Sequence, residues 1–341
     1  MLDIKISLKT IILNLIVITL LGGCSNFSQQ LSPTFDPTSA GWTIITPRPV
    51  NTYTPTASTQ IGTTSNLTRT STAPAIPTEV TSMTPQSNTE TPETATPTSG
   101  DKTCKFEPGQ VRLDGFESAV LNERMNFRIY LPPCYDDRTE DQYPVLYLLH
   151  GLYKTYDQWV DMEVDAVADN LIADGQIVPM IIVMPGETAF KNIEDSEFNE
   201  AVMQELIPYV DAHYRSRTER SWRAIGGLSR GAAWALRIGV DNWRSFSAIG
   251  MHSLPLIRSE RERLLTALVD IPLGLTPRLF MDIGNRDPEL VYAQLFEEAL
   301  TEEKIPHTWY MFIGLHEESY WQAHLAIYLR WYAEEWVGIS R

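Results

Sequence analysis

The chain reads Gly226-Gly227-Leu228-Ser229-Arg230-Gly231-Ala232 at the point where a predicted strand meets a predicted helix. The run 222–225 before it is short and largely apolar, which is typical of a buried strand, and the run 232–236 after it is typical of a helix. A G-x-S-x-G pattern in this setting predicts a nucleophile elbow, which lifts a serine hydroxyl clear of the sheet. Small residues at a tight strand–helix contact are the alternative, so the prediction depends on the partners of Ser229.

A serine nucleophile needs a histidine base and a carboxylate that orients this base, and both follow in the chain. A buried strand is predicted over 278–283, and Asp287 lies in the turn beyond its carboxyl end, whereas Asp282 falls inside the strand. A further strand over 307–312 is followed by His316. The order serine, acid, histidine is that of α/β-hydrolases, so we predict a triad of Ser229, Asp287 and His316. Because Asp287 precedes Pro288, a helix N-cap is the alternative role for it.

The remaining histidines occupy less favourable places along the chain. His213 ends a predicted helix, His307 precedes its strand, and His324 lies inside the last helix, so we interpret these three as structural. His252 follows a strand predicted over 246–249, and we expect it to face the site and contact substrate.

A tetrahedral intermediate also needs two hydrogen-bond donors for its oxyanion. We predict that one is the backbone N–H of Arg230, which follows the nucleophile and begins a helix. An apolar strand over 145–149 runs into His150-Gly151, so the backbone N–H of Leu152 is the predicted second donor, and His150 is expected to orient this loop. Tyr153 and Trp159 lie close by in the sequence and are predicted to line the substrate pocket.

From about residue 104 onward the chain resembles the putative-esterase branch of the α/β-hydrolases, which includes esterase D-type hydrolases, feruloyl esterases and enterochelin esterases. This resemblance implies an α/β-hydrolase fold, with a central, mostly parallel sheet and helices on both faces, and hydrolysis of a carboxylic ester through an acyl-enzyme. Two positions depart from the family pattern, since Arg230 replaces a common methionine and Ala232 a common glycine. The matching segments are 128–133, 143–151, Trp159, 169–172, 205–210, 226–231, 284–287 and 314–316.

The first hundred residues predict an exported, anchored protein rather than a folded domain. Lys5 and Lys9 precede an apolar stretch over 11–21 that stops at Leu21-Gly22-Gly23-Cys24, so residues 1–23 are predicted to be a lipoprotein signal peptide and Cys24 the lipidated residue. An ordinary secretory signal or an uncleaved anchor is the alternative. Residues 24–100 are rich in Thr, Pro and Ser and predict a disordered stalk, which leaves 101–341 as the esterase domain. We therefore expect an extracytoplasmic protein, held at the cell membrane by its lipid.

The cysteines and the net charge indicate which cross-links, cofactors and partners the chain can have. Cys104 and Cys134 are the two cysteines besides Cys24, and such a pair in an exported chain suggests a disulfide, with two free thiols as the alternative. No spacing of Cys, His and carboxylates resembles a metal site and no glycine-rich loop suits a nucleotide, so we expect neither metal nor cofactor. Almost all of the net charge of −16 lies in residues 101–341, which makes nucleic acid an unsuitable partner.

Taken together, these features predict a membrane-anchored serine esterase whose substrate is a small-molecule or glycan-linked ester. An acyltransferase would use the same triad, with an alcohol in place of water, and therefore stays open. A degenerate hydrolase that only binds a ligand is the other alternative, and the presence of all three triad residues counts against it.

Overall fold

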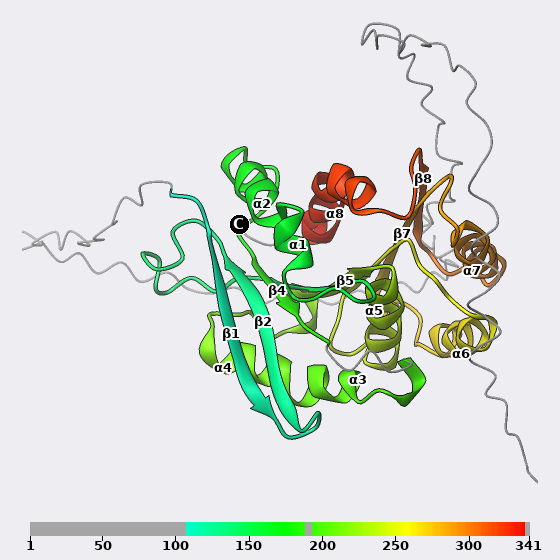
Figure 1. The fold of residues 1–341 in the computed structure, drawn as a ribbon, viewed down its shortest axis with the longest axis horizontal. Helices are drawn as coiled ribbons and strands as arrows, with labels where there is room; N and C mark the ends of the chain where they lie inside the picture. The colour runs from blue at the N-terminus through cyan, green and yellow to red at the C-terminus, as the bar shows by residue number, and fades with distance from the viewer. Residues whose placement is uncertain (1–106, 188–192, 338–341) are drawn as a thin grey trace, which may run out of the picture. The chain divides into compact units, whose positions relative to one another are not determined.

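The computed structural model describes residues 107–187 and 193–337, which form an eight-stranded sheet with helices packed on both faces (Figure 1). The strands follow the order β1-β2-β4-β3-β5-β6-β7-β8 across the sheet. Their bounds are β1 Gln110–Ser118, β2 Glu123–Leu131, β3 Val145–Leu149, β4 Ile181–Pro185, β5 Arg223–Leu228, β6 Ala248–His252, β7 Arg278–Gly284 and β8 Thr308–Phe312.

The sheet combines an antiparallel end with a parallel remainder. β1 and β2 form a hairpin in which Gln110 pairs with Leu131, and β2 then pairs with β4 in antiparallel fashion. From β4 to β8 all neighbours are parallel, so the carboxyl ends of these strands meet at one edge of the sheet. In open parallel sheets, ligands bind at this carboxyl edge, where the connecting loops supply side chains.

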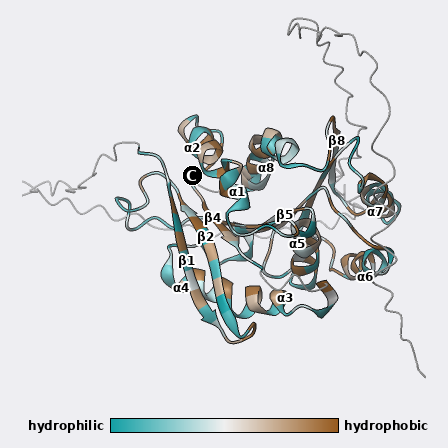
Figure 2. Ribbon diagram, in the orientation of Figure 1, coloured by the Kyte–Doolittle hydropathy of each residue, from teal (hydrophilic) through white to brown (hydrophobic). Residues whose placement is uncertain are grey.

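Helices pack on both faces of the sheet. In the view of Figure 1, α1, α2 and α8 lie above the sheet and α3, α4 and α6 below it. The helices carry hydrophilic and hydrophobic residues side by side, as expected for elements that bury one face (Figure 2). Their bounds are α1 Gln158–Asp161, α2 Val164–Ala173, η1 Ile193–Asp195, α3 Phe198–Ala201, η2 Val202–Leu206, α4 Ile207–His213, η3 Arg220–Trp222, α5 Arg230–Asp241, α6 Arg258–Val269, α7 Leu290–Glu302 and α8 Glu318–Val337.

Two apolar cores result, one on each side of the sheet. Along β3 the side chains of Val145, Tyr147 and Leu149 enter the core under α3 to α7, and Leu146 and Leu148 enter the core under α1, α2 and α8. All five are buried, which explains why this strand is a continuous apolar run rather than an alternating one.

The architecture confirms the predicted fold class, although several predicted strand boundaries differ by up to three residues; β5, for example, ends at Leu228 instead of residue 225. The strand expected over 246–249 runs from Ala248 to His252, so His252 belongs to the sheet instead of the loop that follows it. The predicted signal peptide, Cys24, the stalk, Cys104 and the boundary at residue 101 lie outside the described residues and stay predictions. Within residues 107–187 and 193–337, no helix is both long and apolar enough to cross a membrane.

Candidate active site

Ser229 occupies a sharp turn between β5 and α5 at the carboxyl edge of the sheet. Its backbone has φ of 52° and ψ of −124°, a region that residues other than glycine rarely adopt, and its N–H donates to the carbonyl oxygen of His252 over 2.8 Å. The flanking glycines make the turn possible, because a Cβ at Gly227 would meet the backbone of Gly231, and one at Gly231 would meet the carbonyl oxygen of Leu149. The partly exposed hydroxyl is thereby held above the sheet.

His316 and Asp287 complete a hydrogen-bonded chain with this serine. Nε2 of His316 lies 2.8 Å from Oγ of Ser229, and Nδ1 lies 2.9 Å from Oδ2 and 3.0 Å from Oδ1 of Asp287. With a proton on Nδ1 facing the carboxylate, Nε2 accepts the hydroxyl proton of Ser229. Asp287 lies in the turn after β7 and His316 in the loop after β8, which are the positions that the sequence predicts.

The Asp287 carboxylate is buried and well supplied with donors. Oδ1 accepts the backbone N–H of Glu289 over 2.8 Å, and the hydroxyl of Ser253 donates to the same carboxylate. Burial alone would raise the pKa of Asp287, but the bonds from His316, Glu289 and Ser253 together hold it below its usual range. Asp287 therefore binds the N–H of Glu289 while also facing the imidazole, but it is not the N-cap that the alternative interpretation expects, because α7 begins at Leu290 with Glu289 as its N-cap.

A loop from the neighbouring strand β3 passes beside the serine. A Cβ built on Gly151 would lie 3.7 Å from Cβ of Ser229, so the loop backbone approaches the nucleophile closely. The N–H of Gly151 donates to Oε1 of the buried Gln158 over 2.8 Å, and its carbonyl oxygen lies 2.8 Å from Nδ1 of His150. The bond to the carbonyl oxygen, together with one from the backbone N–H of Lys154 to the same oxygen over 3.2 Å, fixes the peptide that carries the N–H of Leu152.

The side chain of Arg230 turns away from the oxyanion position into a buried ion pair. Its Nη2 and Nε donate to the two carboxylate oxygens of Glu187 over 2.7 and 2.9 Å, and Nε1 of Trp234 donates to the same carboxylate over 3.1 Å. The side chains of Arg230 and Glu187 are only 12% and 5% exposed. No motif points to Glu187, and its one signal in the sequence is the unusual arginine, which requires a partner when buried.

The sequence was compared with profiles of known protein families. The sequence profile described as "Putative esterase" matches residues 118–332, which is more than half of the chain. The chain belongs to this family. The predicted family is therefore confirmed, and its α/β-hydrolase fold agrees with the sheet described above.

Several proteins that are similar to this chain are named as esterases. An endo-1,4-beta-xylanase/feruloyl esterase from Xylanibacter ruminicola is 33% identical over 216 residues, which are 59% of this chain and 30% of that protein. The chain thus spans less than a third of that relative's length. A solved ferulic acid esterase superimposes with a TM-score of 0.62 at 25% identity, over 67% of this chain and 99% of the other. An S-formylglutathione hydrolase from Staphylococcus aureus superimposes with a TM-score of 0.56 at 16% identity, over 67% and 98%, and shows the same fold.

The prediction for His252 needs correction. Its ring is fully buried, with Nδ1 2.6 Å from Oδ1 of Asp282 and Nε2 3.1 Å from the hydroxyl of Tyr332. Oδ2 of Asp282 accepts the hydroxyls of Tyr320 and Tyr328, each over 2.7 Å. His252 is the last residue of β6, and its ring packs against Tyr328 of α8 in the core, so it is not accessible to a substrate.

The two residues predicted to line the pocket have opposite environments. Trp159 is buried, and its Nε1 donates to the carbonyl oxygen of Leu149 over 3.1 Å, so it supports the loop from below and does not face substrate. Tyr153 is 77% exposed beside the loop, and Leu152 and Leu315 are exposed to about two fifths, at 42% and 40%. Within the described residues, no cluster of three or more His, Cys, Asp or Glu side chains suits a metal ion.

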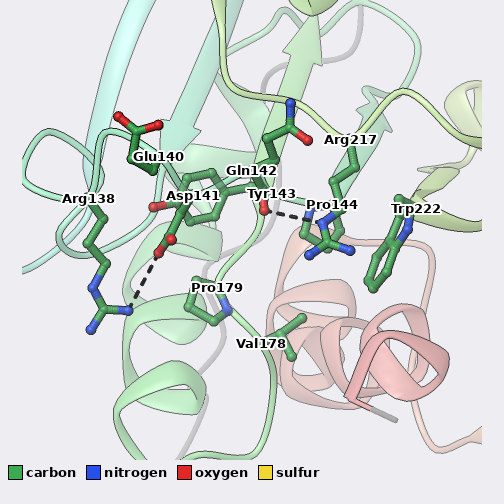
Figure 3. Close-up of a pocket in the computed structure, with 10 residues that line it drawn as sticks. All are labelled: Arg138, Glu140, Asp141, Gln142, Tyr143, Pro144, Val178, Pro179, Arg217 and Trp222. Atoms are coloured by element: carbon green, nitrogen blue, oxygen red, sulfur yellow. Dashed lines mark hydrogen bonds and ion pairs between the residues drawn. The ribbon is translucent and has the colours of Figure 1, made fainter. Parts of the chain in front are cut away.

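A pocket of about 450 Å³ lies at the other edge of the sheet (Figure 3). Its walls come from segments that precede β3, β4 and β5, whereas Ser229, Asp287 and His316 follow the carboxyl ends of their strands. Arg138 pairs with Asp141 over 3.9 Å, and Nε of Arg217 donates to the carbonyl oxygen of Gln142 over 3.4 Å. The pocket is therefore separate from the triad. Its lining residues are Arg138, Glu140, Asp141, Gln142, Tyr143, Pro144, Val178, Pro179, Arg217 and Trp222.

Proposed function

We propose that the protein is a serine esterase that hydrolyses a carboxylic ester through an acyl-enzyme. The observation that carries this proposal is the continuous chain from Oγ of Ser229 through His316 to the buried carboxylate of Asp287. Membership of the Putative esterase family supports the same reaction.

The arrangement accounts for each proton in the reaction. Oγ of Ser229 attacks the ester carbonyl while Nε2 of His316 takes the hydroxyl proton, and Asp287 stabilises the imidazolium that forms. The backbone N–H groups of Arg230 and Leu152 receive the oxyanion. The intermediate then expels the alcohol, which takes the proton from His316. Water attacks the acyl-enzyme by the same route, releasing the acid and restoring Ser229.

The substrate class follows from the surface around the serine and from the relatives. Tyr153, Leu152 and Leu315 offer exposed apolar surface beside the nucleophile, which suits an ester with an apolar or aromatic acyl group. A relative is named xylanase/feruloyl esterase, and this name supports an ester attached to a small molecule or a glycan.

The test is active-site labelling combined with turnover of the full-length protein. A fluorophosphonate probe should label Ser229, and p-nitrophenyl and feruloyl esters should be hydrolysed. The matched variant Ser229→Ala should lose both signals while remaining folded. Absence of labelling and turnover in the folded wild type would refute the esterase and favour a degenerate binding module. Products in which an added alcohol replaces water as the main acceptor would instead establish an acyltransferase.

We also propose that the protein is exported and held at the membrane by lipid on Cys24. The support is the pair Lys5 and Lys9, the apolar stretch 11–21 and the sequence Leu21-Gly22-Gly23-Cys24. Metabolic labelling with palmitate should mark the wild type and not Cys24→Ser, which should leave the membrane fraction. Palmitate labelling that persists in Cys24→Ser would refute the anchor and leave the esterase proposal intact.

A disulfide between Cys104 and Cys134 belongs to the same proposal of an exported chain. It would close a loop of about 30 residues and stabilise the fold by about 3 to 4 kcal/mol. Peptide mapping without reductant should recover the two cysteines in one linked peptide. Recovery of both as free thiols from the exported protein would refute the pairing.

A further inference from the structure

Glu187 contacts two residues, Arg230 and His150, each of which is linked to one of the two proposed oxyanion donors. Glu187 follows β4 at the carboxyl edge of the sheet and is 5% exposed. Its side chain binds Arg230, whose backbone N–H is the first donor, and its backbone N–H binds His150, which holds the peptide of the second donor. The sequence separates Glu187 from these residues by 43 and 37 positions, so the contact depends on the folded sheet.

The contact with His150 fixes the protonation of its ring. The backbone N–H of Glu187 donates to Nε2 of His150 over 2.8 Å, so Nε2 carries no proton and Nδ1 carries one. Nδ1–H then donates to the carbonyl oxygen of Gly151 over 2.8 Å. In a trans peptide the C=O and N–H point in opposite directions, so a carbonyl held by His150 turns the N–H of Leu152 the other way. Burial lowers the pKa of His150, which keeps the ring neutral.

The contact with Arg230 fixes the first turn of α5. The guanidinium forms a two-point ion pair with the Glu187 carboxylate, which also accepts the indole N–H of Trp234 from the same helix. A buried two-point pair allows little rotation, so the backbone of Arg230 is held in one orientation relative to Ser229. Without the Glu187 carboxylate, the guanidinium would lose this two-point contact and the constraint that the contact places on the first turn of α5.

We infer that Glu187 is a positioning residue for the oxyanion hole, since it orients the backbone donors of Arg230 and Leu152 together. This inference rests on the proposed esterase function and adds to it the residue that aligns the two donors. It predicts that loss of the Glu187 carboxylate weakens transition-state binding more than ground-state binding.

The test compares Glu187→Gln with wild type in the full-length protein. We expect kcat to fall on the order of 10-fold to 100-fold with KM nearly unchanged. Removal of one oxyanion donor costs on the order of 10² to 10³ in kcat, and here the Arg230 donor is displaced instead of removed, while the backbone N–H of Glu187 still binds His150. The affinity for phenylboronic acid, which forms a tetrahedral adduct on serine, should fall by the same factor as kcat/KM. Active-site titration with a fluorophosphonate corrects every rate for the fraction of folded enzyme.

The matched control is Glu260→Gln, which breaks another buried glutamate–arginine pair, between Glu260 of α6 and Arg237 of α5. Glu260 binds Arg237 over 3.1 Å and is 9% exposed, but neither residue contacts the loop after β3. This control should lower stability and leave kcat and boronate affinity unchanged. If Glu187→Gln does not fold, Glu187→Asp carries the same test, because it keeps the charge and withdraws the carboxylate by one methylene.

A second pair of variants tests the contact with His150. His150→Asn keeps an N–H near the position of Nδ1 and should retain activity within about tenfold of wild type, whereas His150→Ala should lose on the order of 100-fold. If folded Glu187→Gln shows the kcat and boronate affinity of wild type, the inference about Glu187 is overturned. The esterase proposal still stands in that case, provided that the wild type hydrolyses esters and is labelled at Ser229. Failure of the wild type to hydrolyse any ester or to be labelled would instead refute the esterase proposal itself.

Discussion

Nδ1 of His252 lies 2.6 Å from Oδ1 of Asp282, which forms a fully buried imidazole–carboxylate pair near that of His316 and Asp287. The two aspartates are five residues apart on the same strand and its following turn, yet their surroundings differ. Asp282 is enclosed by the core under α8, whereas Asp287 faces a partly exposed imidazole beside Ser229. The inner pair therefore stabilises the fold, and the outer pair is placed for chemistry.

Substitution of the two aspartates by asparagine should separate these roles. Asp287→Asn should lower kcat by about 10²-fold to 10⁴-fold, because the amide no longer fixes the tautomer of His316 or stabilises its charged form. Asp282→Asn should instead destabilise the protein by about 3 kcal/mol, because three buried donors lose their charged acceptor. Steady-state kinetics and urea unfolding check both. A larger loss of turnover in folded Asp282→Asn than in Asp287→Asn would contradict this assignment.

Replacement of Ser229 should reveal the strain in the elbow. Ser229→Ala and His316→Ala should each lower ester hydrolysis on the order of 10⁴-fold or more with little loss of folding. Ser229→Gly should be equally inactive but about 1 kcal/mol more stable than Ser229→Ala. Backbone strain of this kind costs about 1 to 3 kcal/mol, and the greater freedom of glycine in the unfolded chain offsets part of the gain. Equal melting temperatures of the two variants would show that the elbow is unstrained.

Acid should destabilise the protein through His150. Burial holds the pKa of this histidine below the usual 6.5, so between the two values the unfolded chain binds a proton that the folded chain does not. The contribution of neutral His150 to the free energy of unfolding is therefore complete above about pH 6.5. Below this pH the free energy of unfolding falls, by at most about 1.4 kcal/mol per pH unit. Urea unfolding at pH 7.5 and 5.5 should show a smaller loss in His150→Asn than in wild type. Identical losses would contradict the prediction.

Two glycines of the sheet make room for a tyrosine of α8. A Cβ at Gly226 or at Gly250 would fall on the hydroxyl of Tyr332. We expect Gly250→Ala to destabilise the protein by about 2 kcal/mol, because overpacking a buried site forces side chains or backbone to shift. Adding Tyr332→Phe should restore part of the stability, since the atom nearest the new methyl group is gone. Additive melting-temperature changes in the double variant would argue against this steric account.

The positions of the three predicted triad residues could be predicted from the sequence, because each residue follows a recognisable strand. Apolar runs locate β5, β7 and β8, and the carboxyl ends of parallel strands meet at one edge, so Ser229, Asp287 and His316 could be placed together without a structure. The loop after β3 could be located for the same reason.

The sequence does not show in which direction a side chain points. The strand predicted over 246–249 ends three residues before β6 does, and a residue inside a strand, such as His252, points to one face of the sheet or the other. Trp159 is close to the nucleophile loop in the sequence, but its ring packs beneath that loop. Glu187 and Gln158 belong to no motif, and their contacts depend on loops that approach each other only in the folded sheet.

The spacing of the triad has a consequence for the newly made chain. Ser229 and His316 are 87 residues apart, and they meet only when β7 and β8 have joined the sheet beside β6. At a synthesis rate of about 5 to 20 residues per second, roughly 4 to 17 seconds separate the appearance of the nucleophile from that of its base. During this interval the serine has no proton acceptor. On the proposed mechanism, a nascent chain therefore cannot cleave esters until β7 and β8 have joined the sheet.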